Sequence, residues 1–228
     1  MGGSKWEDSQ QDNVPPFFKT LGGRFKRIRK RPRGKPEPSV YGLKKECLGE
    51  LEKLAEQGLV DVFYGDESRV GSEGYVPYGW QFPGEQVCIR AERGYKVNIF
   101  GLISRGDKCH WATSGQNIDG LFVVGQLERL SFKIAKETFV VLDNARAHGS
   151  KMFRERLPYW QERGLFVFLL PTYSPHLNIA ETLWRKLKCE WLVPEDYLEK
   201  DSLLYAVNRC MANVGKELTI NFSPFNEN

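Results

Sequence analysis

The sequence predicts an α/β protein with a mixed β-sheet and helices on both of its faces. Several strand patterns without helices between them occupy the first half of the chain, which indicates hairpins. Helical and strand patterns alternate after residue 119, which predicts parallel strands joined by crossover helices. The length of 228 residues fits one large domain with its own core, or one domain plus a tail.

Short elements are expected before the first long helix. Residues 15–21 read as a helix end, residues 24–31 as a short ribbon and residues 32–38 as an extended linker. Apolar side chains then recur at helical spacing, and Gly58 follows as a C-terminal cap. This helix is predicted from Leu43, Cys47, Leu51, Leu54 and Ala55.

The middle of the chain has the pattern of a meander. Strands are predicted over residues 59–64, 87–91, 96–104 and 109–113. Residues 71–86 are rich in glycine, proline and aromatic residues, which indicates a hairpin or an inserted loop.

The second half alternates between helices and strands. Two buried strands are predicted, over residues 137–142 and 165–170, and a loop over residues 171–176. The predicted helices cover residues 119–131, 150–163, 178–191 and about 201–215.

Composition excludes several classes of protein. No apolar run approaches the ~18 residues of a membrane span, and no signal peptide is visible, so neither a membrane role nor secretion is expected. The five cysteines are odd in number and widely spaced, which argues against disulfides and zinc modules and fits a reducing cytoplasm.

Positive charge is concentrated near the N-terminus. Nine basic and no acidic residues lie between Lys19 and Lys35, whereas residues 41–228 have a net charge of −2. Such a patch suits nucleic acid, although a solvated linker without a partner is the alternative. The candidate DNA-binding residues are Arg24, Lys26, Arg27, Arg29, Lys30, Arg31, Arg33 and Lys35. We expect a basic arm over residues 1–40 and a catalytic domain over residues 41–228.

Three acids are candidates for chemistry. Asp66 and Asp143 follow apolar strands, and Glu181 lies in the first turn of a predicted helix. Carboxylates brought together repel one another unless divalent cations neutralise them, and Mg²⁺ accepts such oxygen ligands. Two ions ~4 Å apart would clamp the attacking and leaving oxygens of a phosphodiester. Because neighbouring strand residues face opposite sides, only one of Asp66 and Glu67 can face such a site.

Each acid also has a structural interpretation. Asp66 and Asp143 could be turn residues, and Glu181 could form a capping box with Asn178. Aromatic residues of the 71–86 segment could pack on the sheet or anchor a partner subunit; they are Tyr75, Tyr78, Trp80 and Phe82.

Two local motifs decide more than the acids alone. Residues 140–148 read V-V-L-D-N-A-R-A-H, and residues 170–184 read L-P-T-Y-S-P-H-L-N-I-A-E-T-L-W, with Leu187-Lys188 following. Together with F-Y-G-D-E-S around Asp66, they resemble the DDE transposases of the mariner-related insertion-sequence-630 family. Ile179-Ala180 replaces the family's Pro-Ile, but the spacing to Glu181 is kept. The resemblance covers about residues 24–215.

The resemblance implies a ribonuclease-H-like, five-stranded fold and a catalytic, metal-binding triad of Asp66, Asp143 and Glu181. It implies two Mg²⁺ or Mn²⁺ ions per site, and supporting roles for Asn144, His148 and Trp184. His148 is assigned to hydrogen bonding or packing rather than proton transfer, and Trp184 to packing under the site.

The resemblance further implies DNA as partner, both transposon ends and a target at a TA step, a homodimer, and a cytoplasmic, nucleoid-associated protein in bacteria. Most of the family's N-terminal helix-turn-helix pair is missing from this sequence. Two alternatives to a transposase stay open, namely a nuclease without strand transfer and a non-catalytic DNA-binding or dimerisation module.

Overall fold

The structure is a computed structural model, and it describes residues 34–71, 94–144, 150–223 and 225. The chain divides into two units, residues 1–34 and residues 35–228. Several sequence predictions therefore lie outside the described residues. They concern the helix end, the ribbon, the strand at 87–91, nearly all of the 71–86 segment, His148, and the basic residues from Arg24 to Arg33.

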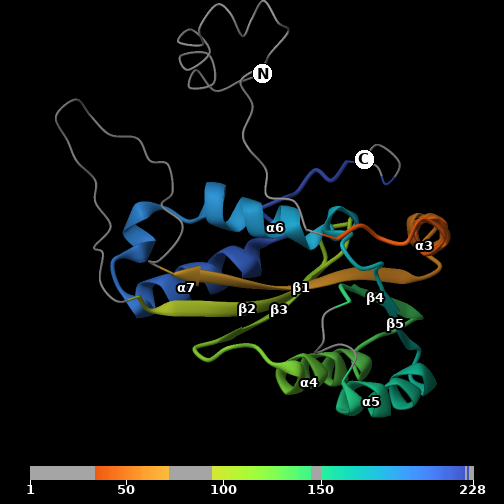
Figure 1. Cartoon of the computed structure of the whole chain (residues 1–228). Helices are drawn as coiled ribbons and strands as arrows, with labels where there is room; N and C mark the ends of the chain where they lie inside the picture. Colours follow the sequence, from red (N-terminus) through yellow and green to blue (C-terminus); the bar gives the residue numbers. More distant parts are fainter. Residues whose placement is uncertain (1–33, 72–93, 145–149, 224, 226–228) are drawn as a thin grey trace, which may run out of the picture. The chain divides into compact units, whose positions relative to one another are not determined.

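The described strands form one five-stranded mixed sheet in the order β3-β2-β1-β4-β5. The strands β1, β2 and β3 form an antiparallel meander, while β4 and β5 run parallel to β1 (Figure 1). The predicted mixed sheet is thus confirmed. The bounds are β1 Asp61–Gly71, β2 Lys96–Ile103, β3 Cys109–Ser114, β4 Thr138–Leu142 and β5 Leu165–Leu169.

Helices cover both faces of the sheet, as the sequence predicts. In Figure 1, the green helices α4 and α5 lie below the sheet and the blue helix α6 lies above it. The described helices are α3 Pro38–Glu56, α4 Gly120–Ser131, α5 Lys151–Glu162, α6 Ala180–Lys186 and α7 Lys200–Asn213. Short helical turns occupy Pro175–Leu177, Leu187–Trp191 (a π-helix) and Pro194–Tyr197. Among the described residues, no helix combines the length and apolarity that a membrane crossing requires.

Local sequence signals explain where the helices begin and end. The Asp119 carboxylate accepts the Phe122 amide at 2.9 Å, and the Ser150 hydroxyl accepts the Phe153 amide at 3.3 Å, so each caps a helix start. Gly58 follows α3 with a φ of 75°, a conformation that suits glycine at a helix end.

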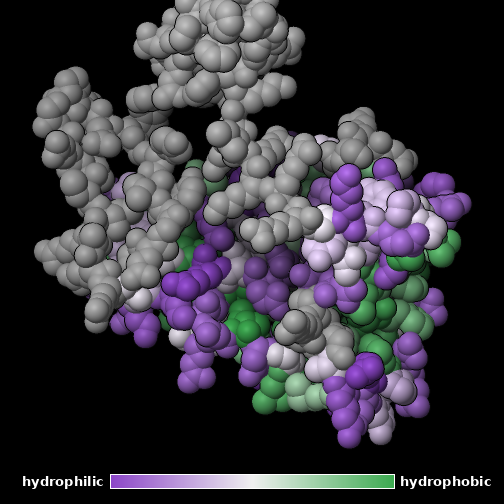
Figure 2. Space-filling model, in the orientation of Figure 1, coloured by the Kyte–Doolittle hydropathy of each residue, from purple (hydrophilic) through white to green (hydrophobic). Residues whose placement is uncertain are grey.

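The core lies in two layers, one on each face of the sheet. Val62 and Tyr64 of β1 pack with α3, α6 and α7, whereas Phe63 packs with α4 and α5. Figure 2 shows apolar surface in the region of β4 and β5, and hydrophilic residues on the outer side of α5. Since strand residues alternate between faces, Asp66 lies on the same face as Val62 and Tyr64, which is the face covered by α6.

A partly exposed acid also joins α4 to α5. The Glu128 carboxylate accepts hydrogen bonds from Arg163 (2.7 Å) and Trp160 (2.9 Å) and pairs with Arg156 (2.7 Å). Burial raises the pKa of Glu128, but these donors outweigh burial and lower it to about 2. The network therefore stabilises the layer opposite α6.

The main difference from prediction concerns β1. The apolar run predicts a strand that ends at residue 64, but β1 continues to Gly71. Pairing with β2 runs from Tyr64 opposite Ile103 to Gly71 opposite Lys96, so backbone hydrogen bonds sustain a polar strand. Asp66 therefore lies inside a strand and not in a turn after it.

Candidate active site

Asp66 is held by a hydrogen bond from the α6 helix. The Trp184 indole Nε1 donates to Oδ2 of Asp66 at 2.9 Å. Burial raises the pKa of the Asp66 carboxyl to about 7, and the charges of Glu181 and Glu67 add to this, while the indole donor opposes it. Asp66 is thus a partly buried acid close to two other acids.

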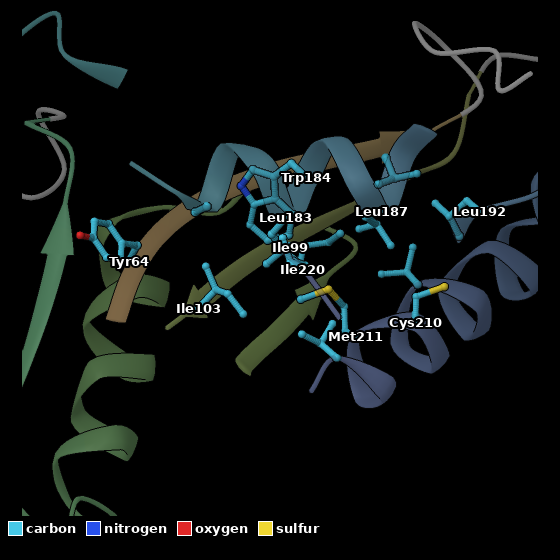
Figure 3. Packing of buried hydrophobic residues seen from close by; sticks show 14 of the residues in the cluster. Tyr64, Ile99, Ile103, Leu183, Trp184, Leu187, Leu192, Cys210, Met211 and Ile220 are labelled. Carbon is cyan, nitrogen blue, oxygen red and sulfur yellow. The ribbon is translucent and has the colours of Figure 1, made fainter. Parts of the chain in front are cut away.

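A glycine makes room for this contact. Gly101 of β2 stands opposite Asp66 in the sheet, and a Cβ at that position would lie 2.5 Å from Cη2 of Trp184. The indole therefore lies directly on the backbone of β2, and Trp184 is only 4% exposed. Figure 3 shows Trp184 projecting from α6 onto the sheet. Trp184 packs as the sequence predicts, and in addition it hydrogen-bonds Asp66.

Asn178 fastens the start of α6 to β1. Its Nδ2 donates to the carbonyl oxygen of Gly65 at 3.0 Å, and its Oδ1 accepts the Ala180 amide at 3.0 Å. The side chain is 5% exposed, so both contacts are shielded from water. The position of α6 is therefore fixed to the residue that precedes Asp66.

Glu181 lies in the first turn of α6 and is exposed. Its charge is among those that raise the pKa of Asp66, which indicates that the two carboxylates are near each other. Within the described residues, the Glu181 carboxylate has no hydrogen-bond or ion-pair partner, so the capping box with Asn178, the alternative interpretation of Glu181, does not form. Ile179 occupies the N-cap position of α6, and its apolar side chain makes no capping hydrogen bond.

Asp143 directly follows β4, which runs parallel beside β1. The paired positions run from Asp61 opposite Thr138 to Tyr64 opposite Val141, an offset of 77 residues. Extended two residues beyond the last pair, the same offset would bring position 143 beside position 66. Val141 packs in the layer on the α6 face, so alternation assigns Asp143 to the face of Asp66. Asn144 follows it and is exposed.

Lys188 is a basic residue near these acids that the prediction left without a role. It lies seven residues after Glu181, and hence on the same side of the helical segment as Glu181 and Trp184. Burial lowers the pKa of its ammonium group, and the charges of Glu181 and Asp66 oppose part of that change. Within the described part of the chain, no carboxylate forms an ion pair with it.

The donor chemistry of the site fits a hard divalent cation, because carboxylates that repel one another gain from a cation between them. In the described residues no three His, Cys, Asp or Glu side chains stand close enough together to hold a metal ion.

Two of the residues that support this arrangement had partial sequence signals. Gly101 interrupts the apolar run K-V-N-I-F-G-L-I, and an isolated glycine in a strand indicates close approach by another group. Asn178 stands in the second motif, but its bond to Gly65 joins residues 113 positions apart and has no local signal.

Comparison with known proteins identifies the class. The family model described as DDE superfamily endonuclease matches residues 61–204, more than half of the chain, and the chain belongs to this family. The matched residues include the whole described sheet and all three candidate acids. No curated protein sequence matches the chain.

Solved structures of the Mos1 transposase share the fold. The "Mos1 transposase paired-end complex with left transposon end" has a TM-score of 0.55 at 17% identity, over 86% of this chain and 61% of that chain. The "Mos1 mariner paired end complex with Mn" has a TM-score of 0.54 at 16% identity, over 86% and 62%. The ribonuclease-H-like fold is thereby confirmed, and the chain spans about 61% of the length of the Mos1 chain.

Proposed function

We propose that this chain is the catalytic part of a metal-dependent DNA transposase of the mariner-related insertion-sequence-630 branch. The observation that carries the proposal is the arrangement around Asp66. One helix supplies both a hydrogen bond to this partly buried acid and a second acid, Glu181, close to it. The β1–β4 register supports Asp143 as the third member.

Asp66, Asp143 and Glu181 would hold Mg²⁺ or Mn²⁺, two ions per site. When bound, these ions supply activation of water or a 3′-hydroxyl and stabilisation of the departing oxyanion. The protein's own part is to fix the ligands. Trp184 orients one oxygen of Asp66, and Asn178 sets the distance between α6 and β1. One Mos1 paired-end complex is a complex with Mn, which supports a divalent ion here.

Lys188 would bind the phosphate that enters the site. A phosphodiester brings negative charge to a place already rich in carboxylates, so a nearby cation favours its binding. Lys188 meets this need, because it is half-buried beside Asp66 and Glu181 and has no described ion-pair partner.

The wider partners belong to the same proposal. The Mos1 transposase forms a paired-end complex with a left transposon end, which supports DNA ends as substrate here. Target joining at a TA step and a homodimer belong to the proposal through the resemblance alone. The arm of residues 1–40 would add sequence-independent phosphate contacts through the basic residues from Arg24 to Lys35. The domain of residues 41–228 would perform the chemistry, in the cytoplasm of a bacterium at the nucleoid.

The test compares two neighbouring acids. Asp66→Asn should abolish Mn²⁺ binding, measured by calorimetry, and metal-dependent nicking of plasmid DNA. Glu67→Gln, on the opposite face of β1, should keep both activities above one tenth of the wild-type level. A Mn²⁺-soaked crystal should give anomalous density at Asp66 and Asp143.

The products separate the alternatives. Nicked DNA without joined 3′ ends would indicate a nuclease. DNA binding that is unchanged in Asp66→Asn, with no cleavage by either protein, would indicate a binding module and refute the proposal.

A further inference from the structure

The segment between β5 and α6 is fastened at both ends beside the candidate acids. At one end, the Leu170 amide donates to the carbonyl oxygen of Leu142, the last residue of β4, at 2.8 Å. At the other, Asn178 donates to Gly65, the residue before Asp66. The residues in between therefore span from the end of β4 to the middle of β1, where Leu142 and Gly65 directly precede Asp143 and Asp66.

Contacts along this segment hold its middle in place. The Tyr41 hydroxyl and Nε2 of His176 lie 3.0 Å apart, which ties the segment to α3. Ser174 is buried, and its hydroxyl donates to the carbonyl oxygen of Thr172 at 3.3 Å. Tyr173 thus lies between two residues, Thr172 and Ser174, that are joined by a hydrogen bond.

Tyr173 has an unusual backbone conformation. Its φ is 59°, and among the described residues only Asp107 shares a positive φ without being glycine. A bulky side chain at such a position is strained, whereas glycine or asparagine adopts it readily. The ring is also 54% exposed, so core packing does not account for its presence. Strained residues of this kind are concentrated at functional sites.

We propose that Tyr173 is a stacking platform for an unpaired nucleobase next to the phosphodiester held by the acids. This inference rests on the proposed function, since it takes DNA as the substrate. A tyrosine ring stacks on any base whose face is free, and bases acquire free faces at the ends of opened or cut strands. The platform gives the site a preference for DNA with an unpaired end over continuous duplex.

The test uses Tyr173→Asn, which removes the ring and suits the positive φ. The probe is a short duplex with an unpaired 3′ tail carrying 2-aminopurine, compared with the blunt duplex, in EDTA so that no cleavage occurs. Asparagine should weaken binding of the tailed duplex by about 5- to 150-fold, the equivalent of one stacked base, and abolish quenching of the 2-aminopurine. Binding of the blunt duplex should stay within twofold. The melting temperature should remain unchanged or rise by up to about 4 °C.

Two further variants complete the design. Tyr173→Phe keeps the ring and should retain tail binding and quenching. Tyr159→Asn is the matched control, because Tyr159 is 52% exposed on α5, across the sheet from α6, and it should leave tail binding unchanged. Equal affinity of wild type and Tyr173→Asn for the tailed duplex would overturn the inference, and so would an equal loss for both duplexes or a wild type that binds neither. Because these assays contain no metal, failure of metal-dependent cleavage would count against the proposed function alone.

Discussion

The contact between Gly101 and Trp184 gives the sharpest test of how the site is built. An alanine Cβ at position 101 would lie 2.5 Å from Cη2 and 3.1 Å from Cζ2 of Trp184, so the indole must move. Forcing extra atoms into a packed layer costs about 1–3 kcal/mol. Gly101→Ala should therefore lower the free energy of unfolding by that amount. It should also reduce metal-dependent nicking, because the displaced indole no longer holds Asp66.

A double-mutant cycle isolates this contact. In a Trp184→Phe background the clashing ring atoms are gone, and alanine should then be neutral or stabilise by about 0.5–1 kcal/mol, as glycine-to-alanine changes in regular structure do. The coupling energy between the two positions should thus be about 1–4 kcal/mol, measured by urea unfolding with unchanged m-values. Gly125→Ala on α4 is the control, since nothing lies within 4 Å of its added Cβ. If Gly101→Ala stabilises the protein as much as Gly125→Ala does, the reasoning is refuted.

Other contacts in the structure lead to three more predictions. Glu128→Gln should lower the free energy of unfolding by about 2 kcal/mol at pH 7. A pKa lowered from 4.5 to about 2 corresponds to ~3.4 kcal/mol, and the partial exposure of the side chain reduces this value. Because the pKa of Glu128 is depressed in the folded protein, its stabilisation is present above pH 4.5 and is lost as the pH falls toward 2. The urea midpoints of variant and wild type should therefore converge at pH 2. A difference between the two midpoints that does not change with pH would contradict this. Lys188→Met should lower by about one the slope of log affinity for DNA against log salt concentration. Lys186→Met is the control, because Lys186 pairs with Glu190, and it should leave this slope unchanged. Equal slopes for the two variants would contradict the phosphate role of Lys188. Asn178→Asp keeps the acceptor for the Ala180 amide but removes the side-chain donor to the Gly65 carbonyl. It should lower the free energy of unfolding in urea by about 1–3 kcal/mol and weaken Mn²⁺ binding. Mn²⁺ affinity equal to that of the wild type would show that this bond does not set the geometry of the site.

The strands that the sequence predicts well are those that are apolar on both faces. The strands β4 and β5 read as continuous apolar runs because helices cover both sides of them, and their predicted bounds differ from the structure by one residue. The second half of β1 is polar, and its strand conformation depends on pairing with β2. Such pairing between residues far apart in sequence has no local signal, so the predicted strand ended too early.

The same division applies to the site. Asp66, Asp143 and Glu181 are recognisable because they stand in motifs with fixed spacing. The side chains that orient them are not recognisable in this way. The bond from Trp184 to Asp66 spans 118 positions, and it depends on where α6 crosses the sheet. A helix crossing is set by the packing of the whole layer, which no short stretch of sequence specifies.

Asp66 has two glycine neighbours, Gly65 before it in β1 and Gly101 opposite it in β2, and each allows close packing on a different face of the sheet. On the α6 face, Gly101 lets the indole of Trp184 reach the carboxylate. On the other face, a Cβ at Gly65 would lie 2.5 Å from Cδ2 of Leu142, so the core layer closes tightly behind the acid. The acid is thus fixed from both sides by packing, and no basic side chain among the described residues forms an ion pair with it that would compete with a cation for its charge. The hydrophobic layers offset the free-energy cost of holding this carboxylate partly out of water. A divalent ion bound to the carboxylate would remove that cost, and the free energy so released would favour binding of the ion.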